Sequence, residues 1–310
     1  MSSDILGGEE YRVELADCIE HMHAMPSASV DMCVHSPPFP AVFAYSDSHA
    51  DLGNSEDLNY EAPLHFSFYL KALRRVLKPG RVLIVHCTQI ALLKRSGREG
   101  MFDFRGMIIR LAQRAGFIYK YDWLVRRNPQ TQALRTHAHE LQFAGLERDR
   151  ANSRGCMGDY LIKFQAPGEN DVPIDTAGEV SRDEWIQWAE ACWKDIRETD
   201  TLNVKEGREE SDVKHICPMA LGIYERCIRL FSNHGEIILD PFAGIGSCGF
   251  VALGGTSPVT GRTLQNTRRF YGIEMKGSYH ATAVRNCEKA LRQRVDRQKT
   301  LFDTLAETHP

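Results

Sequence analysis

Two short segments, far apart in the chain, carry the residue types best suited to chemistry. The first is Ser36-Pro37-Pro38-Phe39, which follows an apolar run at 30–34. The second is Asp240-Pro241-Phe242-Ala243-Gly244-Ile245-Gly246, which follows a shorter run at 236–239. Glycines at the passage from a strand to a helix let the backbone approach a nucleotide, and the helix amides then face the ligand. The second segment therefore predicts a nucleotide-binding loop, although an ordinary tight turn has a similar pattern.

The proline pair gives the first segment its own chemistry. Proline fixes φ and donates no backbone hydrogen bond, so the carbonyls of His35, Ser36 and Pro37 can face a cleft. These carbonyls and the Ser36 hydroxyl would accept hydrogen bonds from an exocyclic amino group. Phe39 would stack on the base that carries this group. A rigid turn at a strand end is the alternative interpretation of the same four residues.

An acidic residue follows the glycine loop at the end of the next expected strand. Glu274 ends the run Tyr271-Gly272-Ile273-Glu274, where a carboxylate can accept hydrogen bonds from both hydroxyls of a ribose. Glu274 lies farther from Asp240 than the usual ~20 residues. We attribute the difference to a turn-rich insertion at 255–267. A solvated glutamate at a strand end is the alternative interpretation.

The glycine loop lies close to the end of the sequence. Because the chain ends at residue 310, the stretch after Gly246 is too short to build a doubly wound sheet. Earlier strands must therefore complete the sheet around this loop. The order of the segments predicts a circularly permuted fold.

Strand and helix patterns alternate through most of the chain, which predicts an α/β fold with a mostly parallel sheet and helices on both faces. The expected strands cover 11–16, 30–35, 81–87, 117–125, 159–164, 236–239 and 268–274. The expected helices cover 18–25, 64–77, 104–115, 218–231, 247–253 and 278–294. Lys78-Pro79-Gly80 is expected to end the second helix. The tryptophans between 181 and 197 are expected to pack against the rest of the chain.

A cluster of arginines follows the expected strand at 117–125. Since the whole chain has a net charge of −3, any affinity for a polyanion must come from such a local patch. The candidate phosphate contacts are Arg126, Arg127, Arg135, Arg148, Arg150 and Arg154. A solvated loop with incidental charge is the alternative.

Composition excludes several other classes. The nine cysteines form no C-x-x-C pair, which favours a reducing, cytoplasmic location. No apolar run approaches the 18 residues typical of a membrane-spanning helix, so no membrane association is expected. The stretch His137-Ala138-His139-Glu140 has no further ligands at metal-binding spacing, and we expect no metal site.

The two segments resemble the signatures of the S-adenosylmethionine-dependent amino-methyltransferases, [DNS]-P-P-[YFW] and D-P-F-x-G-x-G. Their order, with the proline segment first, is similar to the beta class of DNA methyltransferases, which act on adenine N6 or cytosine N4. Ala16-Asp17-Cys18 and His215-Ile216-Cys217-Pro218 resemble further family segments. The second of these departs from the K-P pair that is commoner in the family.

The resemblance implies a circularly permuted, Rossmann-like methyltransferase sheet with an inserted target-recognition region. Residues 1–125 would form the catalytic part, 126–213 the target-recognition region with a returning strand at 159–164, and 214–310 the cofactor-binding part. The resemblance assigns catalysis to Ser36, Pro37, Pro38 and Phe39. It assigns S-adenosylmethionine binding to Asp17, His215, Pro218, Asp240, Phe242, Gly244, Gly246 and Glu274.

The implied reaction is direct methylation of the exocyclic amino group of a base flipped out of double-stranded DNA. Ser36 favours cytosine N4 slightly over adenine N6. A homodimer or higher oligomer, and a place in restriction–modification, are further implications of the resemblance. The alternatives are an RNA or protein amino-methyltransferase of the same fold, or a DNA-binding relative without activity.

Overall fold

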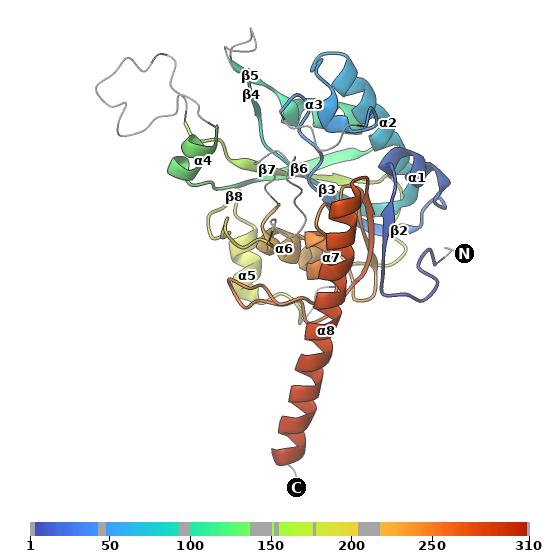
Figure 1. The fold of residues 1–310 in the computed structure, drawn as a ribbon, viewed down its shortest axis with the longest axis vertical. Coiled ribbons are helices and arrows are strands. Elements are labelled where there is room, and N and C mark those ends of the chain that lie inside the picture. The colour runs from blue at the N-terminus through green and yellow to red at the C-terminus, as the bar shows by residue number, and fades with distance from the viewer. Residues whose placement is uncertain are drawn as a thin grey trace.

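The computed structural model describes residues 4–42, 48–92, 100–136, 151, 155–175, 178–203 and 218–308. The centre of this described part is an eight-stranded sheet with the strand order β1-β10-β9-β2-β3-β7-β6-β8 (Figure 1). Its strands are β1 (Tyr11–Leu15), β2 (Val30–His35), β3 (Leu77–Cys87), β6 (Ile118–Val125), β7 (Asp159–Gln165), β8 (Cys192–Trp193), β9 (Ile237–Asp240) and β10 (Arg269–Glu274).

The sheet is mostly parallel, as the alternation of strand and helix patterns predicts. Strand β7 runs antiparallel to both of its neighbours, β3 and β6. The other pairings within the sheet are parallel. The expected α/β class is therefore confirmed.

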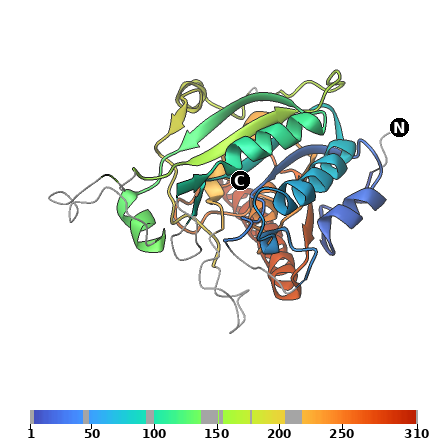
Figure 2. The same cartoon turned by 90° about the horizontal axis from the view of Figure 1, so that it is seen from above.

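Helices cover the two faces of the sheet, as Figure 2 shows from above. One layer contains α1 (Cys18–Ala24), α2 (Glu61–Val76) and α3 (Phe104–Arg114), and the other contains α6 (Leu221–Phe231), α7 (Ser247–Ala252) and α8 (Gly277–Thr308). Each layer has its own apolar core. Along β2, Cys33 belongs to the first core, whereas Met32 and Val34 belong to the second. A central strand that is buried on both faces explains the unbroken apolar character of this segment.

The late strands β9 and β10 lie between the early strands β1 and β2. The early strands β1 and β2 therefore complete the sheet around the glycine loop. The permuted order that the sequence predicts is present in the sheet itself.

The start of β3 differs from the sequence-based expectation. Helix α2 ends at Val76, and β3 begins at once with Leu77 instead of after Gly80. Its pairing with β2 shifts register between Val30 and Met32. Such an irregularity lets a strand accommodate a proline and a glycine with φ of +72° while its pairing continues.

Several small elements lie outside the predicted set. They are the hairpin of β4 (Ile90–Leu92) and β5 (Gly100–Phe102), the single-turn helix η1 (Leu52–Asn54), α4 (Pro129–Thr136), α5 (Arg182–Trp188) and β8. Trp188 and Trp193 are buried, as expected for packing residues, but Trp185 is 57% exposed.

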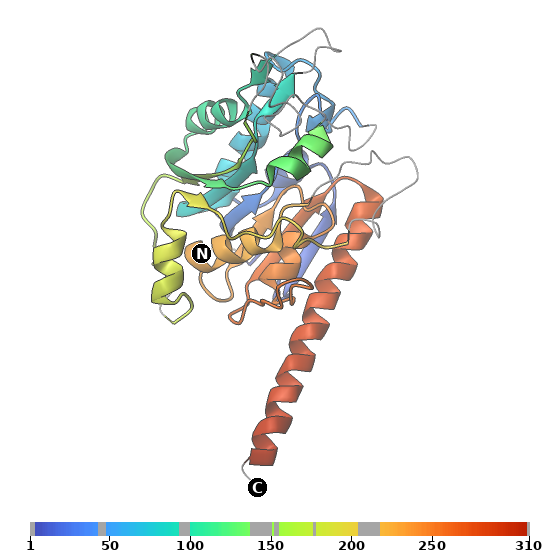
Figure 3. The same ribbon diagram turned by 90° about the vertical axis from the view of Figure 1, so that its left-hand side faces the viewer.

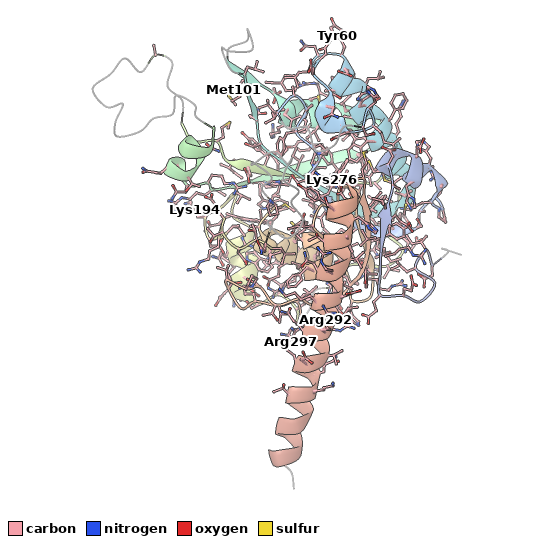
Figure 4. All side chains as sticks on the ribbon, in the orientation of Figure 1. Tyr60, Met101, Lys194, Lys276, Arg292 and Arg297 are labelled. Atoms are coloured by element: carbon pink, nitrogen blue, oxygen red, sulfur yellow. The ribbon has the colours of Figure 1, made fainter. Side chains whose placement is uncertain are left out.

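Helix α8 is much longer than the expected 278–294. Neither glycine nor proline occurs between Ser278 and Thr308, so nothing in the sequence ends the helix earlier. Arg297 is tied to Thr256 and the Gly254 carbonyl. Beyond it the helix projects away from the described body (Figures 3 and 4). Among the described residues, no helix combines the length and apolarity that a membrane crossing requires.

Candidate active site

The two chemical segments meet in one cleft at the carboxyl ends of β2, β9 and β10. From β9 the fold continues to β10 on one side of the sheet, while β2 is followed by β3 on the other. In α/β sheets, ligands bind where the strand order reverses in this way. The empty volume of the cleft, counted out to its open mouth, is about 1100 Å³. Residues that line it include Ser36, Pro37, Pro38, Phe39, Pro218, Phe242, Gly244 and Glu274.

The two glycines of the loop have different tasks. Gly244 lines the cleft with φ of +53°, and an added Cβ would meet nothing closer than the Phe242 oxygen at 4.0 Å. Gly246 has φ of +80°, and its added Cβ would lie 2.8 Å from the Cα of Ala283 in α8. Gly244 therefore leaves room on the cleft wall, whereas Gly246 lets α8 pack closely under the loop.

Glu274 fixes the position of the glycine loop. Its carboxylate accepts hydrogen bonds from the backbone amides of Gly244 and Lys276, both at 2.8 Å. Burial raises the pKa of Glu274 to about 7, although these backbone donors oppose the rise. The carboxyl group lines the cleft, so it can also accept hydrogen bonds from a bound ligand.

Asp240 lies beneath the loop and is only 1% exposed. It accepts a hydrogen bond from the Phe242 amide at 3.0 Å. Burial raises the pKa of Asp240 to about 7. Its role in the described structure is to shape the turn, while Phe242 contacts the cleft. The ring of Phe242 also packs on Tyr69, with centroids 5.1 Å apart.

Asp17 caps the first turn of α1 with one carboxylate oxygen. Its Oδ1 accepts hydrogen bonds from the amides of Ile19 and Glu20 at 2.9 and 2.8 Å. Its Oδ2, like the hydroxyl of Ser247 on the cleft wall, is buried and has no partner among the described residues. Buried polar atoms are normally satisfied. Ser247 lines the cleft, so its hydroxyl fits a bound molecule that carries hydrogen-bonding groups. Asp17 itself does not line the cleft, although its neighbours Ala16 and Cys18 do.

The proline segment leaves β2 and forms the opposite wall of the cleft. Phe39 packs on Phe104 with ring centroids 5.5 Å apart and still lines the cleft. Below it, His35 is completely buried between Tyr69 and Phe242. Burial lowers the pKa of His35 to about 3, so this imidazole is neutral. Its ring nitrogens contact the Tyr69 hydroxyl and, at 3.2 Å, the Cys33 sulfur.

Ser36 has a partner that sequence reasoning missed. Its Oγ lies 3.0 Å from Nδ1 of His86, and Nε2 of His86 lies 2.8 Å from Oδ2 of Asp159. His86 occupies the end of β3, where His35 pairs with Val85. The sequence offered one signal for His86, namely a polar residue near the end of a strand expected to be buried. Asp159, however, comes from β7 and could not be placed without the strand order.

The candidate DNA-binding arginines differ in where the structure places them. Arg126 is exposed at the end of β6, and its backbone amide pairs with the Trp193 carbonyl. Arg127 is largely buried and forms ion pairs with Asp159 and, at 3.6 Å, with Glu198. The guanidinium of Arg127 therefore pairs with carboxylates of the protein and is not presented to DNA as an exposed charge. The Arg135 side chain and Arg148, Arg150 and Arg154 lie outside the described residues, as does His215.

Comparison with known proteins agrees with this geometry. The sequence model of a DNA methylase family, of the N6/N4 type, matches residues 30–285. No curated protein sequence matches the chain.

Two solved structures are similar to the fold. A putative DNA modification methylase from Thermus thermophilus, complexed with S-adenosyl-L-methionine, has 21% identity and a TM-score of 0.61, covering 91% of this chain and 96% of that one. The cytosine-N4-specific PvuII DNA methyltransferase has 16% identity and a TM-score of 0.62, covering 90% of this chain and 86% of that one.

Proposed function

This chain belongs to the N6/N4 DNA methylase family, and we propose that it methylates the exocyclic amino nitrogen of cytosine or adenine in double-stranded DNA. One observation carries the proposal. The proline segment at 36–39 and the glycine loop at 240–246 lie far apart in the sequence and line the same cleft.

The family depends on S-adenosylmethionine, which supplies a methyl group on a positively charged sulfur. The residues present fit this cofactor. Glu274 would accept hydrogen bonds from the ribose hydroxyls, and the open wall at Gly244 gives the ligand room. Phe242 and Pro218 add apolar contacts. The unpartnered hydroxyl of Ser247 is available to the remaining polar groups.

The opposite wall suits an amino group carried by a flat ring. The Ser36 hydroxyl and the Pro37 carbonyl would accept its two hydrogens, while Phe39 would stack on the base. These hydrogen bonds draw the nitrogen toward a tetrahedral geometry and make its lone pair available. The protein contributes position and electrostatics. The base must leave the duplex to reach this wall, because stacked bases do not expose their amino groups to such a cleft.

The target base is tested by methylating duplex oligonucleotides with a labelled donor and digesting the product to nucleosides. We expect N4-methylcytosine, because Ser36 favours cytosine. Finding N6-methyladenine alone would overturn that preference and leave the DNA amino-methyltransferase intact.

A panel of DNA, RNA and protein acceptors tests the acceptor class. Transfer to RNA or protein but not to DNA would overturn the proposal. The variant Ser36→Ala tests the catalytic assignment, and full activity in this variant would show that the proline segment is not the acceptor site.

A further inference from the structure

We propose that His86 and Asp159 are positioning residues that hold the Ser36 hydroxyl as a hydrogen-bond acceptor and receive the proton that amino methylation releases. This inference rests on the proposed function. It starts from a continuous chain of contacts, Ser36 to His86 to Asp159, that enters the cleft only at Ser36.

The contacts determine which nitrogen of His86 carries hydrogen. An ionised carboxylate can only accept hydrogen bonds, so Nε2 of His86 must donate to Asp159 at 2.8 Å. In the neutral imidazole, Nδ1 is then an acceptor, and the Ser36 hydroxyl donates to it at 3.0 Å. With its only hydrogen directed inward, the Ser36 oxygen keeps its lone pairs for the amino group of the base.

Asp159 is held in the ionised form that this arrangement needs. Burial by itself opposes ionisation, but the hydrogen bond from His86 and the charge of Arg127 lower the pKa of Asp159 below its usual value. The ion pair with Arg127 also ties the carboxylate to the end of β6. Arg127 thus acts on the site through Asp159.

The same chain can take up the proton of the reaction. The new N–C bond forms as the S–C bond breaks, the S–C electron pair stays on sulfur, and the nitrogen must lose one proton. This proton moves to the Ser36 oxygen while the Ser36 proton moves to Nδ1 of His86, and Asp159 stabilises the resulting imidazolium. After the product leaves, the proton returns through Ser36 to the open cleft.

The first test compares His86→Leu and Asp159→Asn with the wild type. Both should lower kcat about 100-fold, because the first removes the acceptor and the second favours the opposite tautomer.

Cofactor affinity measured by calorimetry should change less than twofold in both variants. His86→Asn retains an acceptor near Nδ1 but cannot take up a proton, so it should keep part of kcat. His23→Asn, at an exposed histidine of α1, is the matched control and should leave kcat unchanged.

The second test needs no variant of the site. Nitrogen-15 NMR of the wild-type protein should show His86 with hydrogen on Nε2 and a hydrogen-bonded Nδ1. The opposite tautomer, or wild-type kcat in Asp159→Asn, would overturn the inference. These results can be told apart from failure of the proposed function. An inactive Ser36→Ala with a fully active Asp159→Asn overturns only the relay, whereas wild-type protein that methylates no DNA overturns the function.

Discussion

At the scale of single residues, the carboxyl group of Glu274 links the shape of the cleft to its affinity for a ligand. Two backbone amides hold it in place, and burial raises its pKa to about 7. Asp51 also opposes its ionisation. Burial raises the pKa of Asp240 to about 7 as well, and the charge of Glu274 contributes to that rise. A ligand that donates hydroxyl hydrogens to Glu274 favours the ionised carboxylate and opposes these effects.

We therefore predict that S-adenosylmethionine affinity rises as pH increases through about 7. Below its pKa, Glu274 is protonated and binding must include the cost of ionising it; above the pKa that cost is absent. Calorimetry at pH 6 and pH 8 measures the difference in Kd. Glu274→Gln should weaken binding about tenfold at pH 8 and reduce the pH dependence. A dependence that persists fully in this variant and disappears in Asp240→Asn would assign the titration to Asp240 instead.

Much of the candidate site could be predicted from residue types, and the rest depended on strand pairing. Four residues of the cleft wall could be predicted, because strand ends and glycine turns have recognisable local patterns. They are Ser36, Phe39, Gly244 and Glu274. The environment of Ser36 was not predictable in this way. His86 offered only one signal, a polar side chain near the end of a strand expected to be buried. Its partner Asp159 becomes a neighbour only because β7 lies beside β3.

At the scale of elements, the glycine loop and α8 depend on one another. Gly246 precedes α7, and the backbone of Ala283 lies against it from α8. The loop can keep its position only while the helix stays close, so the geometry of the cleft depends on this packing.

We predict that Gly246→Ala destabilises the protein by about 2–4 kcal/mol. The left-handed φ of +80° costs a residue with Cβ about 1–2 kcal/mol. The contact of the new Cβ with the Ala283 backbone at 2.8 Å adds the cost of overpacking. Urea unfolding measures the change. Gly277→Ala is the matched control, since an added Cβ there meets nothing within 4 Å; equal stability of the two variants would contradict the packing argument.

The long elements were predictable because their periodicity extends over several turns or a whole buried strand. The short ones were not, since β4, β5 and β8 have only two or three residues each. Helix α5 did carry a signal. Ser181 and Glu184 form a capping box directly before the apolar residues of this helix, and this spacing is typical of a helix start.

At the scale of the whole molecule, the middle of the chain contributes strands to the central sheet and also a helix outside it. Strands β7 and β8 belong to the sheet, while α4 follows the end of β6 and projects from the body (Figure 1). The two neighbouring arginines at the end of β6 face different ways. Arg127 is paired with Asp159 behind the cleft, and Arg126 is exposed directly before α4. Arg126 would therefore contact DNA, while its neighbour Arg127 holds Asp159 in position.

We predict that Arg126→Ala weakens binding to duplex DNA and leaves S-adenosylmethionine affinity unchanged. An exposed guanidinium that contacts one phosphate releases about one counterion, so the slope of log K against log salt should fall by about 1. Fluorescence anisotropy over a salt series measures both the affinity and the slope. The variants Arg135→Ala and Arg148→Ala should behave in the same way, because their charges belong to the same segment of the sequence.

Arg292→Ala on α8 is the matched control for these variants. Its side chain is 67% exposed, and it lies on α8, well away from α4 and the end of β6 (Figure 4). Its loss should change neither the affinity nor the salt slope. If Arg126→Ala, Arg135→Ala and Arg148→Ala all bind DNA as the wild type does, the arginines of this segment are not the phosphate contacts. A slope that falls equally in Arg292→Ala would instead indicate a diffuse effect of net charge, since only a direct phosphate contact distinguishes one exposed arginine from another.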